Sequence, residues 1–121
     1  MINDTYSEYM NVIDQVVSSL DRSLSEVKRV TEGRSDRHKI IGDTVATYMH
    51  ILASTMHVVF GDPGLTFEQK HSIMRIACEK ARSILQKHLP RTWRLYLDTI
   101  RRHVSNRRRE VEKAIHDQVL E

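Results

Sequence analysis

Apolar residues recur every three or four positions along most of the chain, which is the spacing of one face of an α-helix. The first such stripe begins at Tyr6 and ends at Thr31. Gly33 follows it, at the point where helices commonly end in a left-handed residue. The pattern predicts a first helix over residues 4–31, with Ser35 or Asp36 placed to cap the next one. The stripe comprises Tyr6, Met10, Ile13, Val17, Leu20, Leu24, Val27 and Thr31.

A second stripe predicts a helix over residues 36–60. A further apolar strip lies about 100° round this helix, and a helix with two apolar flanks is usually central in its fold or meets a second chain. The first stripe comprises Ile41, Val45, Tyr48, Leu52, Met56 and Val59, and the second Ile40, Ile51 and Val58. The remaining side is predicted to face solvent, and it carries Asp43, Ala46, His50, Ala53, Ser54 and His57.

The sequence Gly61-Asp62-Pro63-Gly64 interrupts the periodic pattern. Thr66 follows, with Gln69 three residues later, which is the pattern of a capping box and starts a third helix over residues 66–88. Pro90 then begins a fourth helix over residues 90–119. Because short connections favour neighbouring antiparallel helices, the sequence predicts one all-α domain over residues 1–121, an up-down four-helix bundle with a long C-terminal helix.

The fourth helix is predicted to extend beyond its neighbours. About 30 residues in a helix span about 45 Å, more than the third helix. The projecting end is expected to expose Val111, Ile115 and Val119. An exposed apolar stripe of this kind favours a partner, so we expect a homodimer.

Composition limits the class of protein. The chain has 121 residues and one Cys, so it holds no internal disulfide and no Cys-based zinc site. No apolar run reaches the roughly 18 residues of a membrane span, and the first residues are acidic rather than a basic leader. We expect a cytoplasmic protein in a reducing compartment, with no membrane association.

Charge is distributed unevenly. Residues 1–60 have a net charge of −2 and residues 61–121 a net charge of +5, which together give +3. Most of the excess lies in residues 91–109, which contain seven Arg and one acid, Asp98. On a helical wheel, Trp93, Tyr96 and Leu97 lie on the inward side of this segment. The outward arc carries Arg91, Arg94, Arg101, Arg102, Arg108 and Arg109, continued by Lys113 and bordered by Lys87.

Arg107 departs from this pattern, because it falls on the apolar side of the wheel. Burying an unpaired guanidinium is costly. We therefore expect either that the bundle ends at Arg107 or that an acid from another helix or chain meets it.

Clustered positive charge favours a polyanionic partner, because association then releases counterions. Arg grips phosphate with a planar fork. Aromatic residues are only 6% of the chain, and Trp93 and Tyr96 are predicted to face inward, which disfavours base stacking on single strands. The sequence thus predicts binding to the phosphates of duplex RNA or DNA through the eight basic residues named above. The alternative is a small regulatory adaptor, such as a viral or phage accessory factor, whose basic helix docks on an acidic protein.

The seven His residues offer weaker chemistry. His50 and His57 are seven positions apart, about 10 Å along a helix, with no ligand-type residue at 53 or 54, so no metal site or other cofactor is predicted. A four-helix bundle with an exposed His is similar in outline to a histidine phosphotransfer domain. Neither His50 nor His57 is followed by the Lys-Gly pair of those domains.

Compact helical ribonucleases of the HEPN type carry an Arg followed, after four to six residues, by a His on a late helix. Arg109 with His116 and Arg82 with His88 have this spacing. In such a site, His116 would be the general acid or base, and Arg109 would stabilise the negative charge of the phosphorane. A chain this rich in Arg and His gives about two such matches by chance, so we expect a protein that is not an enzyme.

Overall fold

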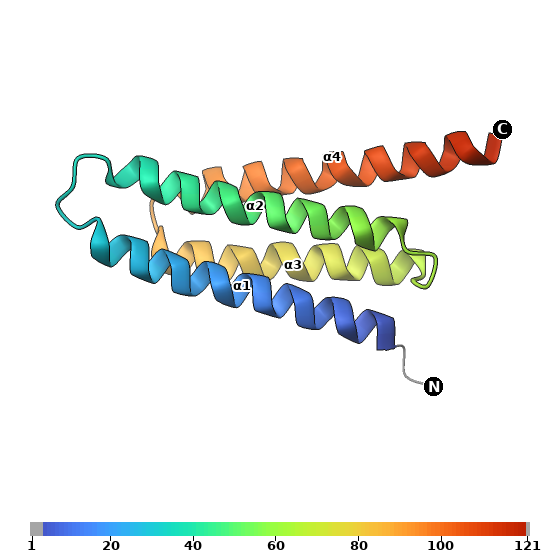
Figure 1. Cartoon of the computed structure of the whole chain (residues 1–121), viewed down its shortest axis with the longest axis horizontal. Coiled ribbons are helices and arrows are strands. Elements are labelled where there is room, and N and C mark those ends of the chain that lie inside the picture. Colours follow the sequence, from blue (N-terminus) through green and yellow to red (C-terminus); the bar gives the residue numbers. More distant parts are fainter. Residues whose placement is uncertain (1–3, 121) are drawn as a thin grey trace.

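The structure, a computed structural model, describes residues 4–120 and shows four helices and no strand within them (Figure 1). The helices are α1 (Asp4–Val30), α2 (Arg37–Gly61), α3 (Phe67–His88) and α4 (Trp93–Leu120). The all-α four-helix prediction is confirmed. The largest difference in bounds lies at α4, because residues 89–92 form a turn in which the Trp93 amide donates to the Leu89 carbonyl at 2.9 Å. Pro90 therefore lies in the turn rather than in the first turn of α4.

The predicted helix ends are largely confirmed. The Gln69 amide donates to the Thr66 hydroxyl at 3.1 Å, and the Thr66 amide donates to the Gln69 side chain at 2.9 Å, so the capping box is complete. Gly33 has a φ of +78°, a left-handed conformation that suits glycine. Asp36 precedes α2, but its side chain does not cap the helix. The carboxylate instead accepts two hydrogen bonds from Arg34, both at 2.9 Å.

The order of the helices around the bundle differs from the sequential one. α1 packs on α2 and α3, and α4 packs on the same two helices, whereas α1 and α4 do not touch and α2 meets α3 only sparsely. The loop between α2 and α3 thus connects diagonally opposite helices. In consequence α2 and α4 are neighbours that run in the same direction, as are α1 and α3 (Figure 1). The inference that each short connection joins neighbours is right for the first and last connections and wrong for the middle one.

The predicted apolar stripes form the core. Five residues of the α1 stripe are buried: Ile13, Val17, Leu20, Leu24 and Thr31. Five of the α2 stripe are buried as well: Ile41, Val45, Leu52, Met56 and Val59. The Thr31 hydroxyl is satisfied by donating to the Val27 carbonyl at 2.5 Å, which allows a polar side chain to lie in this core.

One flank of α2 was expected to face solvent, but α4 covers part of it. Four of its six residues are exposed as predicted: Asp43, His50, Ser54 and His57. Ala53 is buried, and a Cβ placed on Gly42 would lie 3.6 Å from the Tyr96 hydroxyl of α4. The His50 and His103 rings meet edge to face across the same interface, 5.8 Å between centroids. Small side chains let helix axes approach closely, so α4 packs tightly on this flank of α2. The expectation of a wholly solvent-facing flank was wrong.

The C-terminal part of α4 projects beyond the other helices (Figure 1), and residues 112–118 are all exposed. The predicted overhang is confirmed, but its apolar stripe is shorter than expected. Val111 is buried against the end of α2, next to Gly61, so its predicted exposure was wrong. Ile115 is 43% exposed. The side chain of Val119 lies outside the part of the chain that is described.

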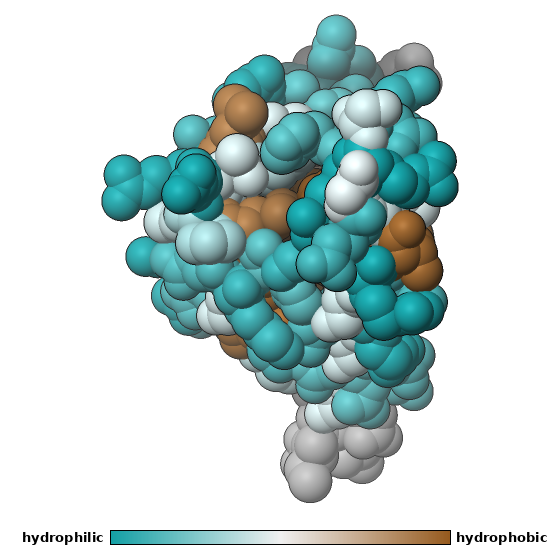
Figure 2. All heavy atoms as spheres, turned by 90° about the vertical axis from the view of Figure 1, so that its left-hand side faces the viewer, coloured by the Kyte–Doolittle hydropathy of each residue, from teal (hydrophilic) through white to brown (hydrophobic). Residues whose placement is uncertain are grey.

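Figure 2 looks onto the end of the bundle that carries the α1–α2 loop and the α3–α4 turn. Hydrophilic side chains cover most of this end, and apolar side chains show in recesses between them. Arg34 and Arg91 are among the exposed residues of these two connections. This end is therefore not a continuous apolar surface for a partner.

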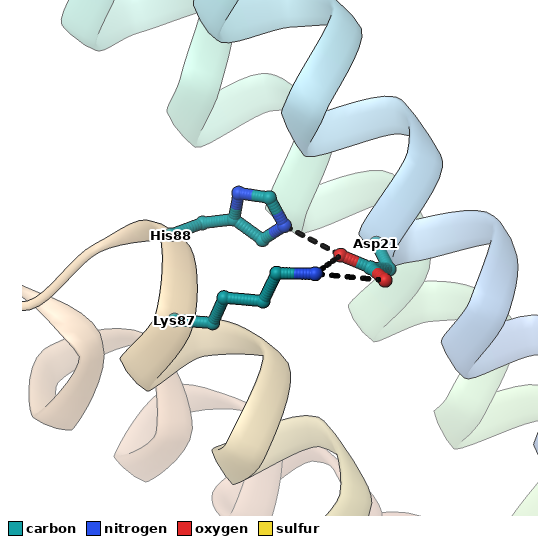
Figure 3. Close-up of polar contacts among 3 residues, drawn as sticks. All are labelled: Asp21, Lys87 and His88. Carbon is teal, nitrogen blue, oxygen red and sulfur yellow. Dashed lines mark hydrogen bonds and ion pairs between the residues drawn. The ribbon is translucent and has the colours of Figure 1, made fainter.

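Polar contacts fix the parallel packing of α1 on α3. Lys80 pairs with Asp14, and at the last two residues of α3 a second cluster forms around Asp21 (Figure 3). The Asp21 carboxylate lies 2.6 Å from His88 Nε2 and accepts from Lys87 Nζ at 3.0 and 3.3 Å. His88 is buried, and its hydrogen bond, followed by that of Lys87, holds the pKa of Asp21 below its usual value. The Asp21 cluster (Asp21, Lys87 and His88) thus ties the last turn of α3 to α1.

Ile100→Ala is expected to lower the free energy of unfolding by about 2–5 kcal/mol, because Ile100 is 1% exposed and its loss leaves a cavity. Ile115→Ala is the matched control on the same helix, and its effect should stay within about 0.5 kcal/mol. Urea denaturation followed by circular dichroism measures both. Equal losses in the two variants would contradict the placement of α4 on the core.

The Asp21 cluster predicts a pH dependence of stability. The pKa of Asp21 is lower in the folded chain than in the unfolded chain, so the carboxylate stabilises the fold above the unfolded value, about 4, and less as the pH falls below it. Asp21→Asn should therefore be less stable than the parent at neutral pH. The gap should narrow as the pH falls below about 4 and the Asp21 carboxylate takes up a proton. Denaturation at a series of pH values tests this, and a gap that does not change with pH would argue against it.

Candidate nucleic-acid interface

Arginines from two helices line one groove between α3 and α4. α3 contributes Arg75 and Arg82, and α4 contributes Arg94, Arg101 and Arg108, with a spacing of seven residues within each set. Seven residues make about two helical turns, so each set lies along one side of its helix. Arg75 and Arg101 line one hollow of the groove, and Arg82, Arg94 and Arg101 line the next.

Three of the other predicted arginines are exposed beside this groove: Arg91, Arg102 and Arg109. Lys113 is exposed on the overhang of α4. We define the arginine face as Arg75, Arg82, Arg91, Arg94, Arg101, Arg102, Arg108 and Arg109. The α4 members were predicted from the sequence. Arg75 and Arg82 were missed, although their spacing of seven repeats that of Arg94, Arg101 and Arg108 and was readable in the sequence.

Most of the arginine face has no carboxylate partner. Among the described residues, no ion pair or hydrogen bond is formed by the side chains of Arg75, Arg82, Arg91, Arg94, Arg101, Arg102 or Arg109. Some basic residues elsewhere do pair with an acid, among them Arg29, Arg34 and Lys80. Most arginines of this face therefore lack a direct carboxylate partner among the described residues, although Glu79 and Asp98 line the same hollows.

Arg107 and Arg108 occupy different positions from those expected. Arg107 is exposed and pairs with Glu110 of its own helix at 3.3 Å, so no acid from another helix is needed. Arg108 turns toward the bundle, with 28% of its side chain exposed and its Nε buried without a hydrogen-bond partner. Its Nε lies 3.8 Å from a Glu112 oxygen. Arg108 therefore borders the groove rather than pointing fully outward.

Lys87 was predicted to border the basic surface, but it is bound to Asp21 on the side of α3 that faces α1. Lys80, seven residues earlier, pairs with α1 in the same way. Lys80 and Lys87 thus face α1, whereas Arg75 and Arg82 face α4. We do not include Lys87 in the arginine face for this reason.

Trp93 lies under two guanidinium groups. The Arg82 and Arg94 guanidinium carbons are 5.3 and 5.2 Å from its ring centroid, within the range of a cation–π contact. Trp93 and Tyr96 are both half-buried and pack against the core. The predicted inward placement of these two rings is confirmed, and the cations over Trp93 make it a poor platform for stacking a base.

The histidines give no convergent site. His88 is buried against Asp21, so it is not available to act with Arg82. His50 contacts His103, and His57 and His116 are exposed on different helices. Within residues 4–120, no three His, Cys, Asp or Glu side chains lie close enough together to hold a metal ion. Burial raises the pKa of the Cys78 thiol, which disfavours the thiolate needed for nucleophilic chemistry.

Comparisons with protein-family models, with curated proteins and with solved structures found no match to this chain. Among the described helices, none combines the length and the apolar character required to cross a membrane. The arginine face is therefore the feature of the molecule that bears most directly on function.

Proposed function

We propose that the chain binds duplex nucleic acid through the phosphates of its backbone. The observation that carries this proposal is the arginine face, in which guanidinium groups from α3 and α4 gather and all but that of Arg108 lack an ion pair with a described carboxylate. Like charges held together on one face repel one another, and a polyanion relieves that repulsion while releasing its counterions.

The dimensions of the face suit an extended polyanion. Arg94 and Arg108 are 14 residues apart on one helix, which is about 21 Å at the helical rise. Phosphates of one strand follow each other at about 3.4 Å along a duplex axis, so several lie within the span of the face. The rows on α3 and α4 belong to helices packed about 8–10 Å apart, which lets guanidinium forks approach a backbone from two sides.

The surroundings of the one Trp favour a duplex over a single strand. Trp93 is occupied by Arg82 and Arg94, and no other Trp is present to stack on a base. Phosphate contacts without base stacking give binding that depends on backbone shape and little on sequence. Duplex RNA and duplex DNA both present such a backbone, and the choice between them is an outcome of the test below.

An acidic protein surface is the second candidate partner. Leu95 is 69% exposed and lies next to Arg94 on α4, and a large apolar side chain beside cations is typical of a protein interface. A partner of this kind would show no dependence on nucleic acid.

The triple variant Arg101→Glu, Arg102→Glu and Arg109→Glu is expected to weaken duplex binding on the order of a hundredfold or more, because each lost charge-assisted contact is replaced by repulsion. All three residues are exposed, so the fold should be retained. The matched control is Arg22→Glu, Arg29→Glu and Arg34→Glu, which makes the same change of charge in α1 and the loop after it.

Fluorescence anisotropy with duplex RNA, duplex DNA and single-stranded probes at two salt concentrations measures both variants. For the parent protein, the affinity for duplexes should fall steeply with salt and be similar across sequences. A triple variant that binds like the parent, or a parent that binds no duplex at low salt, would overturn the proposal. Specific retention of one acidic protein would favour the second candidate.

We also propose that two copies associate through the outer side of α2. Ile51 and Val58 are 40% and 56% exposed there, and residues 44–61 contain no Asp, Glu, Lys or Arg. An uncharged surface lets two basic chains approach without repulsion. α2 packs on α4 but lies diagonally across the bundle from α3, so a contact on its outer side would leave the groove between α3 and α4 accessible.

Val58→Glu is expected to convert a dimer to a monomer, because a charge in an apolar contact is left without solvent or a partner. Ile115→Glu places the same charge on the overhang, at a residue of similar exposure, and should leave the dimer intact. Sedimentation velocity measures both. A monomeric parent would refute the dimer, and dissociation by Ile115→Glu alone would assign the contact to the overhang instead.

A further inference from the structure

A cavity of about 280 Å³ lies in the groove between α3 and α4. Its walls include three apolar side chains: Met74, Cys78 and Val104. Val104 is 2% and Cys78 9% exposed, so the interior of the cavity reaches the edge of the core. A phosphodiester has no apolar group that could contact these walls. Duplex binding therefore does not account for the apolar part of the groove.

Charged side chains line the same cavity. Arg75 and Arg101 contribute two positive charges from opposite helices, and Glu79 contributes one negative charge. Within the described chain, neither Arg75 nor Arg101 is paired with a carboxylate. The cavity therefore has a net charge of +1, which one anionic group on a ligand would neutralise.

We propose that this cavity binds a small amphipathic monocarboxylate, a molecule with one carboxylate and a short apolar body. The carboxylate would lie between Arg75 and Arg101, where charge-assisted hydrogen bonds are available. The apolar body would contact Met74, Cys78 and Val104. A volume near the lower end of ligand pockets, about 300–1,000 Å³, selects a short body rather than a long lipid chain.

The proposal does not rest on nucleic-acid binding, although it uses Arg75 and Arg101, which also belong to the arginine face. The neighbouring hollow, lined by Arg82, Trp93 and Arg94, provides a control. Removing positive charge there changes the electrostatics of the groove without changing the walls of the cavity.

Cys78 offers a direct test, since it lines the cavity and is the only cysteine in the chain. The experiment follows alkylation of the purified protein by N-ethylmaleimide with mass spectrometry, at mildly alkaline pH because burial raises the pKa of this thiol. The probe is n-octanoate, and octan-1-ol is its uncharged counterpart. Octanoate at ten times its dissociation constant should slow alkylation about tenfold.

Variants separate a specific site from general stabilisation. Arg75→Gln with Arg101→Gln should weaken octanoate binding by about tenfold or more. Arg82→Gln with Arg94→Gln removes the same charge one hollow away and should change it by less than about twofold. If Cys78 does not react in the free protein, calorimetric titration with octanoate gives the same comparison.

Three results would overturn the proposal: no binding of octanoate, equal protection by octan-1-ol, or equal affinity in the Arg75 and Arg101 double variant. None of these results bears on duplex binding, which is measured without octanoate. Loss of duplex binding in the triple variant, in turn, leaves the cavity proposal intact.

Discussion

The close packing of α4 against the small-residue flank of α2 determines how the rest of the bundle is arranged. Gly42 and Ala53 let α4 approach, and Tyr96, Leu97 and Ile100 then fill the space toward the core. An amphipathic helix that packs with its apolar side against the core has only one possible rotation about its own axis. That rotation turns Arg94 and Arg101 toward α3 and leaves Arg102 and Arg109 in solvent. The position of the arginine face is thus a consequence of how α4 packs on α2.

The diagonal order of the helices explains why the arginines stay unpaired. The N-terminal half of the chain has more acids than bases, and α1 carries many of them. α1 touches α2 and α3 but not α4, so its carboxylates reach Lys80 and Lys87 of α3 and pair with no described residue of α4. A sequential arrangement would have brought α1 beside α4, where Asp14 and Asp21 are available to neutralise arginines. Charge separation in this protein is therefore a property of the topology, not only of composition.

The parts of the fold that depend on local chemistry could be predicted from the sequence, and the parts that depend on which helices meet could not. Periodicity located the α1 stripe, and the Thr66 and Gln69 side chains marked the start of α3. Small residues are ambiguous, because Ala53 is as compatible with solvent as with a tight helix contact. Arg75 and Arg82 were missed for a related reason: two arginines on one helix form a site only when the facing helix supplies more. The partner of Lys87 lies 66 residues away and leaves no local signal.

Both proposals place an anion against the same groove, but they use different parts of it. A duplex backbone requires a row of cations in solvent, and the exposed Arg102 and Arg109 provide it beside the groove. A small carboxylate ligand requires an apolar wall beside a pair of cations. Cys78 and Val104 provide the wall, and Arg75 and Arg101 provide the cations. Because Arg75 and Arg101 belong to both sites, a bound carboxylate would remove their charge from the arginine face and oppose duplex binding. Linkage requires the reciprocal effect. A bound duplex that contacts Arg101 would lower the affinity of the cavity for the carboxylate by the same factor.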